Sequence, residues 1–138
     1  MAPLKQKGDV AELAVALDLR RRGYRIALPF GEDCDYDLVV DRDGSLERVQ
    51  VKYTASDGHV VQVSCRSHSL TNGKVKTTKL YTAETIDWIA AYDATTDRCY
   101  YVPASLLGSG MAVVALRITP ARNNQVLGIR MAEDFLEL

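Results

Sequence analysis

A lone carboxylate inside an apolar segment is the first residue of this sequence that could do chemistry. Glu12 is the only charged residue from Val10 to Leu17, and every other residue of that segment is Val, Ala or Leu. Removing a carboxylate from water is unfavourable by several kcal/mol unless a cation, a metal ion or a hydrogen-bond donor meets it. Glu12 is therefore expected to have such a partner, the alternative being a helix that turns it to the solvent edge.

A predicted β-hairpin brings three further polar residues together. Two β-rich runs flank Asp43-Gly44, a dipeptide typical of a tight hairpin turn. With a two- or four-residue loop, Asp37 faces Gln50, and Lys52 follows on the same face, whereas a three- or five-residue loop would shift this register. Asp37 and Lys52 then form either an exposed cross-strand pair or part of a catalytic centre. The apolar residues alternate with these polar ones and fall on the opposite face of the hairpin, which supports the same register. They are Leu38, Val40, Val49 and Val51.

A helix must position Glu12. Helical periodicity predicts one from about Gly8 to Arg22, with Gly23 as its stop. Because two of its turns are apolar on all sides, this helix is expected to be buried. The apolar residues that recur at helical spacing are Val10, Leu13, Ala14 and Leu17.

The rest of the chain is rich in strand patterns. The run 60–65 is expected to extend the meander, the polar and basic segment 67–78 to be a loop, and residues 131–138 to form a short amphipathic helix. One helical turn is expected at 82–86. This order predicts a mixed sheet with a helix packed on it, an α/β or α+β domain. Strands are predicted at 24–28, 36–41, 46–53, 60–65, 88–92, 99–102 and 111–118.

Length and composition limit the classes of protein. With 138 residues, 47% of them hydrophobic and 25% charged, the chain is expected to form a single domain over residues 1–138. No apolar run approaches the roughly 20 residues of a membrane span, and no signal-peptide core follows the charged N-terminus. We expect a soluble, cytoplasmic protein. A disulfide framework or zinc site is not indicated, because no CxxC pair occurs among Cys34, Cys65 and Cys99.

Charge is segregated along the chain, although the net charge of −1 argues against a protein that coats nucleic acid by bulk electrostatics. Eight of the 18 acids lie between Glu32 and Asp57, whereas the stretches 58–83 and 98–132 contain no Asp or Glu. Basic stretches around an acidic cluster are either solvated faces or the rim of a polyanion site. Their basic residues include Arg66, Lys74, Lys76, Lys79, Arg117, Arg122 and Arg130.

The order Glu12, Asp37 and Gln50-Val51-Lys52 resembles the PD-(D/E)XK nuclease superfamily, whose core is a helix bearing Glu and a hairpin bearing Asp and (Asp/Glu)-x-Lys. Gln50 stands where the third carboxylate is usual, and Tyr36 where the proline is. Within the superfamily, the chain resembles the small group I intron homing endonucleases and, less closely, archaeal-type Holliday junction resolvases. The matching segments are Gly8-Asp9-Val10-Ala11-Glu12, Tyr36-Asp37-Leu38-Val39-Val40, Val49-Gln50-Val51-Lys52 and Asn123-Asn124-Gln125.

This resemblance implies a restriction-endonuclease-like fold, a mixed β-sheet core flanked by helices, and a metal-dependent DNA endonuclease of the site-specific homing type. Two alternatives stay open. One is a structure-selective Holliday junction resolvase. The other is a nuclease-like DNA-binding module that no longer cleaves because Gln50 leaves the metal site one charge short. Double-stranded or branched DNA is the expected partner, and because one metal centre cuts one strand, a homodimer or a higher even oligomer is expected.

The resemblance also assigns roles to residues. Glu12, Asp37, Gln50 and Lys52 would be catalytic, with Lys52 orienting the attacking water or stabilising the phosphate. Mg²⁺, or Mn²⁺ as the alternative ion, would be held by Glu12, Asp37, Gln50 and the backbone carbonyl near Val51, because this hard ion prefers oxygen ligands and keeps several waters. The expected DNA contacts are Lys74, Lys76, Lys79, Arg117, Arg122, Asn123 and Gln125.

Overall fold

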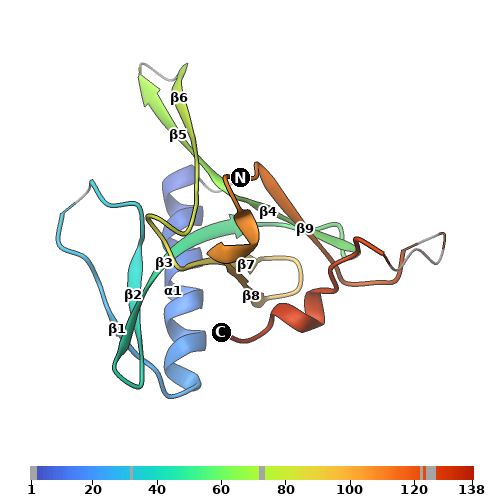
Figure 1. The fold of residues 1–138 in the computed structure, drawn as a ribbon, viewed down its shortest axis with the longest axis horizontal. Coiled ribbons are helices and arrows are strands. Elements are labelled where there is room, and N and C mark those ends of the chain that lie inside the picture. The colour runs from blue at the N-terminus through green and yellow to red at the C-terminus, as the bar shows by residue number, and fades with distance from the viewer. Residues whose placement is uncertain (1–2, 32, 72–73, 122, 124–126) are drawn as a thin grey trace.

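The core of the computed structural model is a mixed five-stranded sheet with one helix packed on it (Figure 1). The structure describes residues 3–31, 33–71, 74–121, 123 and 127–138, with only the backbone course for 68–71 and 74–77. The sheet order is β1-β2-β3-β7-β8, in which β3 and β7 run parallel and the other neighbours antiparallel. These strands are β1 (Arg25–Ala27), β2 (Leu38–Arg42), β3 (Ser45–Thr54), β7 (Trp88–Asp93) and β8 (Arg98–Pro103).

Helix α1 (Leu4–Arg21) packs on the sheet through a face other than the predicted one. The side chains fully buried against the sheet are Ala11, Val15 and Leu19, one turn apart along the helix. By contrast, Leu13 is 71% exposed and Leu17 51% exposed, so the prediction of a helix buried all round is wrong. The helix also begins four residues before the expected Gly8, whereas its end before Gly23, at a φ of 89°, is as predicted.

The β2–β3 hairpin has the predicted two-residue turn and register. Asp43 and Gly44 have φ values of 53° and 92°, the left-handed conformations that such a turn requires. Arg42 pairs with Ser45 and Leu38 with Val49, so the expected apolar face forms and is buried under α1. The hairpin therefore fixes which residues of β3 point away from the helix.

The parallel β3–β7 pair places a second strand beside the candidate site residues of β3. Gln50 lies opposite Ile89, and Lys52 lies opposite Ala91. The Arg48 side chain contributes to this pairing, since its guanidinium donates to both carboxylate oxygens of Asp87, at 3.0 and 3.2 Å. The predicted β7–β8 hairpin is confirmed.

Two small sheets outside the main one correct the sequence prediction. β4 (Val60–Ser64) does not extend the meander but pairs with β9 (Val113–Arg117), because their alternating apolar residues bury one face together. The segment predicted as a polar loop is a hairpin of β5 (Arg66–Thr71) and β6 (Lys74–Leu80), which extends away from the body of the molecule (Figure 1). Two 3₁₀ turns complete the description: Ala104–Leu107 directly follows β8, and Ala132–Phe135 lies near the C-terminus in place of the predicted helix.

The core has two parts, one on each face of the main sheet. One part lies between α1 and the sheet, and the other lies between the sheet, the β4–β9 pair and the first 3₁₀ turn. Among the described residues, no helix combines the length and the apolar character that crossing a bilayer requires. Largest among the fully buried side chains are Leu19, Leu38, Ile86, Ile89, Tyr101, Leu107 and Leu116.

Candidate active site

Asp37 is anchored on the backbone of β3. Its own N–H donates to the carbonyl of Val49 at 2.8 Å, and its Oδ2 accepts a 2.8 Å hydrogen bond from the N–H of Val51. The carboxylate therefore lies against the strand between Gln50 and Lys52, as the predicted register requires. Burial raises the pKa of Asp37, although the Val51 N–H and the charge of Lys52 oppose this effect.

Glu12 meets a second carboxylate. It projects from α1 and lies within hydrogen-bonding reach of the Asp37 carboxyl group. Partial burial raises the pKa of Glu12, and the charge of Asp37 raises it further, while Lys5 opposes the shift. Glu12 is exposed, so the helix turns it to the solvent edge, which was the alternative left open by the sequence. Its neighbour Asp37 is an acid of the same charge, which favours a shared proton or a cation bound to the pair.

Gln50 is 8% exposed, and its amide is fixed by a neighbour on the β1–β2 connection. Its Nε2 donates a 2.6 Å hydrogen bond to the backbone carbonyl of Asp35. This bond uses an N–H of the amide and leaves Oε1 as an acceptor. The amide oxygen is therefore the atom of Gln50 that can serve as a ligand.

Lys52 is held beside Asp37 by the base of the β5–β6 hairpin. Its Nζ donates at 2.8 Å to the backbone carbonyl of Arg66 and lies 5.2 Å from the centre of the Tyr81 ring. Burial lowers the pKa of Lys52, and the negative charge of Asp37 partly offsets this effect. An ammonium group has three N–H donors, so Lys52 has donors left for a substrate or a water molecule.

An open cleft of about 520 Å³ gives access to the carboxylates. Its walls come from the first half of α1 and from the connection between β1 and β2, which approach each other at Glu12 and Asp37. The cleft places both acids at a surface that a large polyanion can reach. Its lining residues are Lys5, Asp9, Glu12, Leu28, Pro29, Gly31, Cys34, Tyr36 and Asp37.

The donor atoms of this site fit a hard divalent ion. No group of three His, Cys, Asp or Glu side chains suited to a metal occurs among the described residues. The site instead offers the carboxylates of Glu12 and Asp37 in an open cleft, with the amide oxygen of buried Gln50 on the neighbouring strand, and all of these are hard oxygen donors. Mg²⁺ is commonly bound by one or two carboxylates and keeps several of its waters, so this set suffices for one ion.

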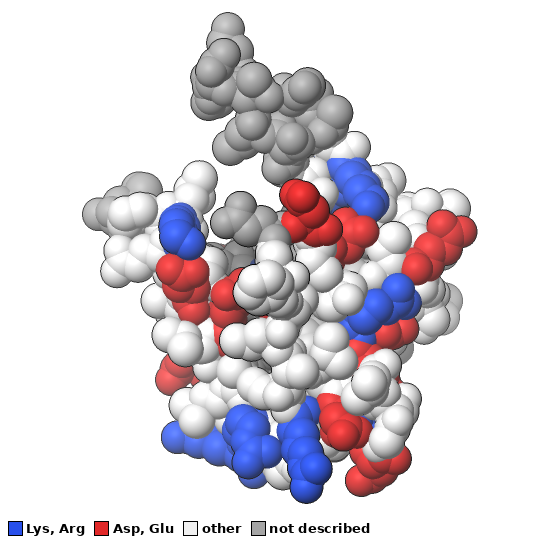
Figure 2. Space-filling model, turned by 90° about the vertical axis from the view of Figure 1, so that its left-hand side faces the viewer, with Lys and Arg blue, Asp and Glu red and all other residues white. Residues whose placement is uncertain are grey.

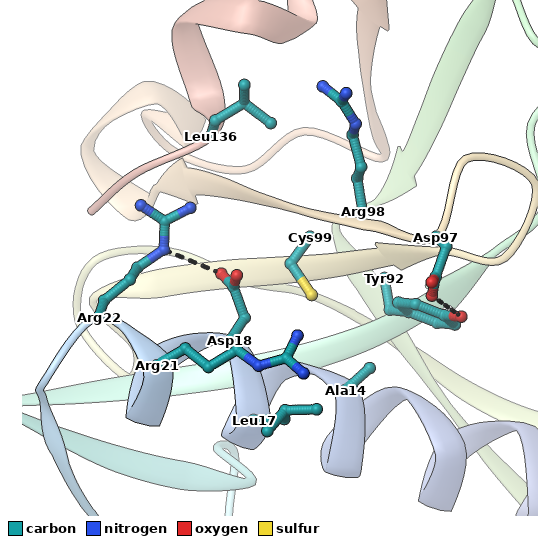
Figure 3. Close-up of a pocket in the computed structure, with 10 residues that line it drawn as sticks. All are labelled: Ala14, Leu17, Asp18, Arg21, Arg22, Tyr92, Asp97, Arg98, Cys99 and Leu136. Carbon is teal, nitrogen blue, oxygen red and sulfur yellow. Dashed lines mark hydrogen bonds and ion pairs between the residues drawn. The ribbon is translucent and has the colours of Figure 1, made fainter.

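A second pocket, of about 320 Å³, lies at the other end of α1 (Figure 3). Its acids are already paired: Asp18 accepts hydrogen bonds from Arg22 and from the Tyr101 hydroxyl, and Asp97 accepts one from Tyr92. Because these carboxylates have donors of their own, this pocket lacks the pair of mutually facing acids found in the cleft. The cleft at Glu12 and Asp37 is therefore the candidate active site.

The basic residues predicted to contact DNA are found in different settings. Both carboxylate oxygens of Asp35 accept hydrogen bonds from Lys79 at 2.9 Å, so the acidic and basic stretches meet there. The Arg117 guanidinium donates to the carbonyls of Thr119 and Pro120, which holds the segment after β9. In the view of Figure 2, acidic side chains lie among Lys and Arg rather than apart from them, with a group of basic side chains at the lower end.

The other predicted contacts fall on β6 and in the segment that follows β9 in the sequence. Lys74 and Lys76 lie on β6, where the structure gives only the backbone course. Asn123 is exposed in a turn. Arg122 and Gln125 lie outside the described residues.

Sequence reasoning missed three contributors to the site: Asp35, the carbonyl of Arg66 and the ring of Tyr81. The two backbone carbonyls leave no signal in a sequence, because every residue has one. The Asp35 side chain does leave a signal, since it precedes Asp37 by two residues in the acid-rich connection. Tyr81 is 4% exposed, and its sequence context at strand spacing is as typical of a packing residue as of one that stacks on a ligand.

Helix α1 packed on the mixed sheet, with Glu12 brought to Asp37 and Lys52, is the arrangement of a restriction-endonuclease-like nuclease. The chain belongs to the PD-(D/E)XK endonuclease family, whose model matches residues 3–138. The predicted family and fold class are thereby confirmed.

Solved structures similar to this chain include those of two DNA nucleases. The bacterial homing endonuclease I-Ssp6803I has a TM-score of 0.73 and 24% sequence identity, over 97% of this chain and 88% of that one. Hjc, a Holliday junction resolvase from Archaeoglobus fulgidus, has a TM-score of 0.47 and 14% identity, over 93% of this chain and 94% of that one. No curated protein matches the sequence.

Proposed function

We propose that this protein is a divalent-metal-dependent DNA endonuclease that hydrolyses phosphodiester bonds at specific sites, in the manner of a homing endonuclease. One observation carries the proposal: the carboxyl groups of Glu12 and Asp37 lie within hydrogen-bonding reach of each other and line one polar cleft, with Lys52 near Asp37. Two carboxylates this close repel each other when both are ionised, and a divalent cation relieves that repulsion. The fold shared with a bacterial homing endonuclease supports the homing type.

The metal ion would be held by Glu12, Asp37, the amide oxygen of Gln50 and the backbone carbonyl near Val51. When bound, Mg²⁺ or Mn²⁺ supplies charge neutralisation at the phosphate and a water that is nucleophilic near neutral pH. The protein's own part is to keep the oxygen donors in place. The Val51 N–H holds the Asp37 carboxylate, and the contact with Asp35 orients the Gln50 amide.

Lys52 would act on the substrate rather than on the metal. Its Nζ is kept near Asp37 by the Arg66 carbonyl and the face of Tyr81. With donors still free, the ammonium group can hydrogen-bond a non-bridging phosphate oxygen, whose negative charge grows during hydrolysis. A residue with this role strengthens its interaction in the transition state and so raises the rate of the chemical step.

DNA would contact the β5–β6 hairpin and the turn that contains Asn123. The hairpin projects from the body of the molecule near Lys52, and its second strand carries Lys74 and Lys76 (Figure 1). Contacts from these lysines to phosphates would position the duplex without reading its sequence, whereas amide side chains such as Asn123 and Gln125 can read base edges. One such centre per chain cuts one strand, so we propose a homodimer or a higher even oligomer for double-strand cleavage.

The test is cleavage by the full chain of a linear duplex pool of random sequence and of a four-way junction, each with Mg²⁺, Mn²⁺ or EDTA. Sequencing of the cut ends should show metal-dependent cleavage at a recurring sequence, and sedimentation should show an even oligomer on the DNA. Cutting confined to the junction would replace the homing type by a resolvase. Tight binding without any cutting would identify a DNA-binding module.

A further inference from the structure

The base of the β5–β6 hairpin is tied to both candidate site residues of β3, Gln50 and Lys52. Lys52 is bonded directly, through the 2.8 Å hydrogen bond from its Nζ to the carbonyl of Arg66, the first residue of β5. Gln50 is bonded indirectly, because its Nε2 donates at 2.6 Å to the carbonyl of Asp35, and the Asp35 carboxylate is paired with Lys79 on β6. The candidate site and the hairpin that projects beside it therefore share two connections.

Asp35 makes these two contacts with two different groups, its backbone carbonyl and its side-chain carboxylate. Its backbone carbonyl orients the Gln50 amide, while both oxygens of its carboxylate accept hydrogen bonds from Lys79 Nζ at 2.9 Å. The pair is half exposed, with 51% of the Lys79 side chain and 37% of the Asp35 side chain accessible, and exposed pairs of this kind add little to stability. We therefore expect the pair to fix the position of the hairpin base relative to Gln50 rather than to stabilise the fold.

We propose that Asp35 is a positioning residue of the nuclease site, and that its ion pair with Lys79 locks the base of the β5–β6 hairpin against Gln50 and Lys52. This inference rests on the proposed function. Side chains that orient a metal ligand from outside typically change metal affinity or activity by about 10- to 100-fold when they are removed. Loss of the Asp35–Lys79 pair should therefore act on the site although neither side chain is a ligand.

The inference gives Lys79 a role different from the phosphate contact expected from the sequence. A lysine that contacts phosphate releases counterions, so its loss lowers the salt slope of log K for DNA binding by about 0.9. A lysine already neutralised by Asp35 releases none, and its loss should leave that slope unchanged. The two roles of Lys79 are thus separable by one titration.

The experiment compares wild type with Asp35→Asn, Lys79→Met, the double variant and Lys79→Arg. Asp35→Asn keeps the backbone carbonyl but loses the charge that holds Lys79. Arg98→Met is the matched control, because Arg98 is an exposed cation of β8 that has no ion pair among the described residues. Mn²⁺ affinity is measured by calorimetry without DNA, and DNA affinity is measured at several salt concentrations with Ca²⁺.

Each single variant should weaken Mn²⁺ binding by about 10-fold, and the double variant should be no worse than either single one, as expected for residues that act as a unit. Lys79→Arg should restore most of the affinity, and the salt slope should not change. Wild-type Mn²⁺ affinity in Asp35→Asn and Lys79→Met, or a slope reduced by about 0.9 in Lys79→Met alone, would overturn the inference.

A readout without metal or DNA separates this inference from the proposed function. The side-chain amide signals of Gln50 in a ¹H–¹⁵N spectrum report its bond to Asp35, and they should shift in Lys79→Met but not in Arg98→Met. If they shift while wild type neither binds Mn²⁺ nor cuts DNA, the positioning role stands and the nuclease proposal fails. If they do not shift, Asp35 does not couple the hairpin to Gln50.

Discussion

The carboxyl groups of Glu12 and Asp37 lie within hydrogen-bonding reach of each other, although one belongs to helix α1 and the other to the start of the β2–β3 hairpin. Packing of Ala11 and Val15 against the sheet brings them together, because Glu12 lies beside this small buried face of the helix. An ionised pair at this distance is unfavourable. The two ionised acids therefore lower the stability of the metal-free fold, and a bound cation can restore it.

Neutralising one acid of the pair should stabilise the protein in EDTA at pH 7. Both carboxyl groups have a raised pKa in the folded state, so folding is penalised once they ionise, and the penalty grows as pH rises through the raised pKa values. We expect Glu12→Gln to have a higher Tm than wild type at pH 7 and no such advantage near pH 4. Thermal unfolding at both pH values, with the exposed Glu133→Gln as control, checks this.

The same variant should lose its response to metal. Mn²⁺ raises the Tm of a protein that binds it only in the folded state. Wild type should therefore gain stability on addition of Mn²⁺, whereas Glu12→Gln should gain much less. An equal Mn²⁺-induced rise in both proteins would place the ion elsewhere.

Asp37→Asn should abolish cleavage and leave DNA binding nearly intact. The asparagine oxygen can still accept the hydrogen bond from the Val51 N–H, so the local structure is kept while the charge for the metal is lost. Since a bound metal ion contributes several kcal/mol to transition-state stabilisation, the rate should fall by at least about 100-fold. Asp33→Asn removes the same charge from the same acidic connection and should cut at the wild-type rate.

The β2–β3 hairpin was predictable because local chemistry determines it. Asp43-Gly44 selects a two-residue turn, and the alternation of apolar residues then has one register that buries it. The position of Asp37 relative to Gln50 and Lys52 follows from that register. Most of the candidate site could therefore be read from the sequence.

The buried face of α1 could not be read in this way. Nearly every residue from Val10 to Leu17 is apolar, so periodicity does not distinguish the face of Ala11 and Val15 from that of Leu13. The β5–β6 hairpin was missed for the opposite reason, because its strands are polar and carry no apolar alternation. Cross-strand pairing forms it, and its contacts with the site run through Asp35 and the Arg66 carbonyl.

Gln50→Glu should not simply restore the usual third carboxylate of the family. Gln50 Nε2 donates to the Asp35 carbonyl at 2.6 Å, and a carboxylate oxygen in its place would face that carbonyl without a proton. We expect the new acid to hold a proton to a higher pH than an ordinary glutamate. Cleavage by the variant should therefore need a higher pH than cleavage by wild type, as pH–rate profiles at saturating Mg²⁺ would show. Identical profiles would mean that the Asp35 contact does not constrain this position.

Asp93 at the end of β7 should be the acid on which the fold depends most. It is fully buried and accepts hydrogen bonds from the N–H and hydroxyl of Ser56 at 2.8 and 2.7 Å, from the N–H of Thr95 and from the hydroxyl of Thr96. Burial alone would raise the pKa of Asp93, but these four hydrogen bonds outweigh it and hold the pKa below its ordinary value. The carboxylate therefore joins the β3–β4 connection to the β7–β8 turn.

Asp93→Asn turns one acceptor oxygen into a donor that faces other donors. Unfolding free energy at pH 7 should fall by about 2 to 4 kcal/mol, which lowers Tm by roughly 6 to 15 °C. Since the folded pKa lies below the unfolded value of about 3.8, the charged form adds stability above that pH and loses it as pH falls through the folded pKa. The difference in unfolding free energy between wild type and variant should thus be full at pH 6 and shrink below pH 4.

The control is Asp57→Asn. Asp57 is an exposed acid that accepts hydrogen bonds from the N–H groups of His59 and Val60, and its replacement should lower the unfolding free energy by less than about 1 kcal/mol. Urea unfolding from pH 2.5 to 7 measures both variants, and equal losses in the two would refute a special role for Asp93.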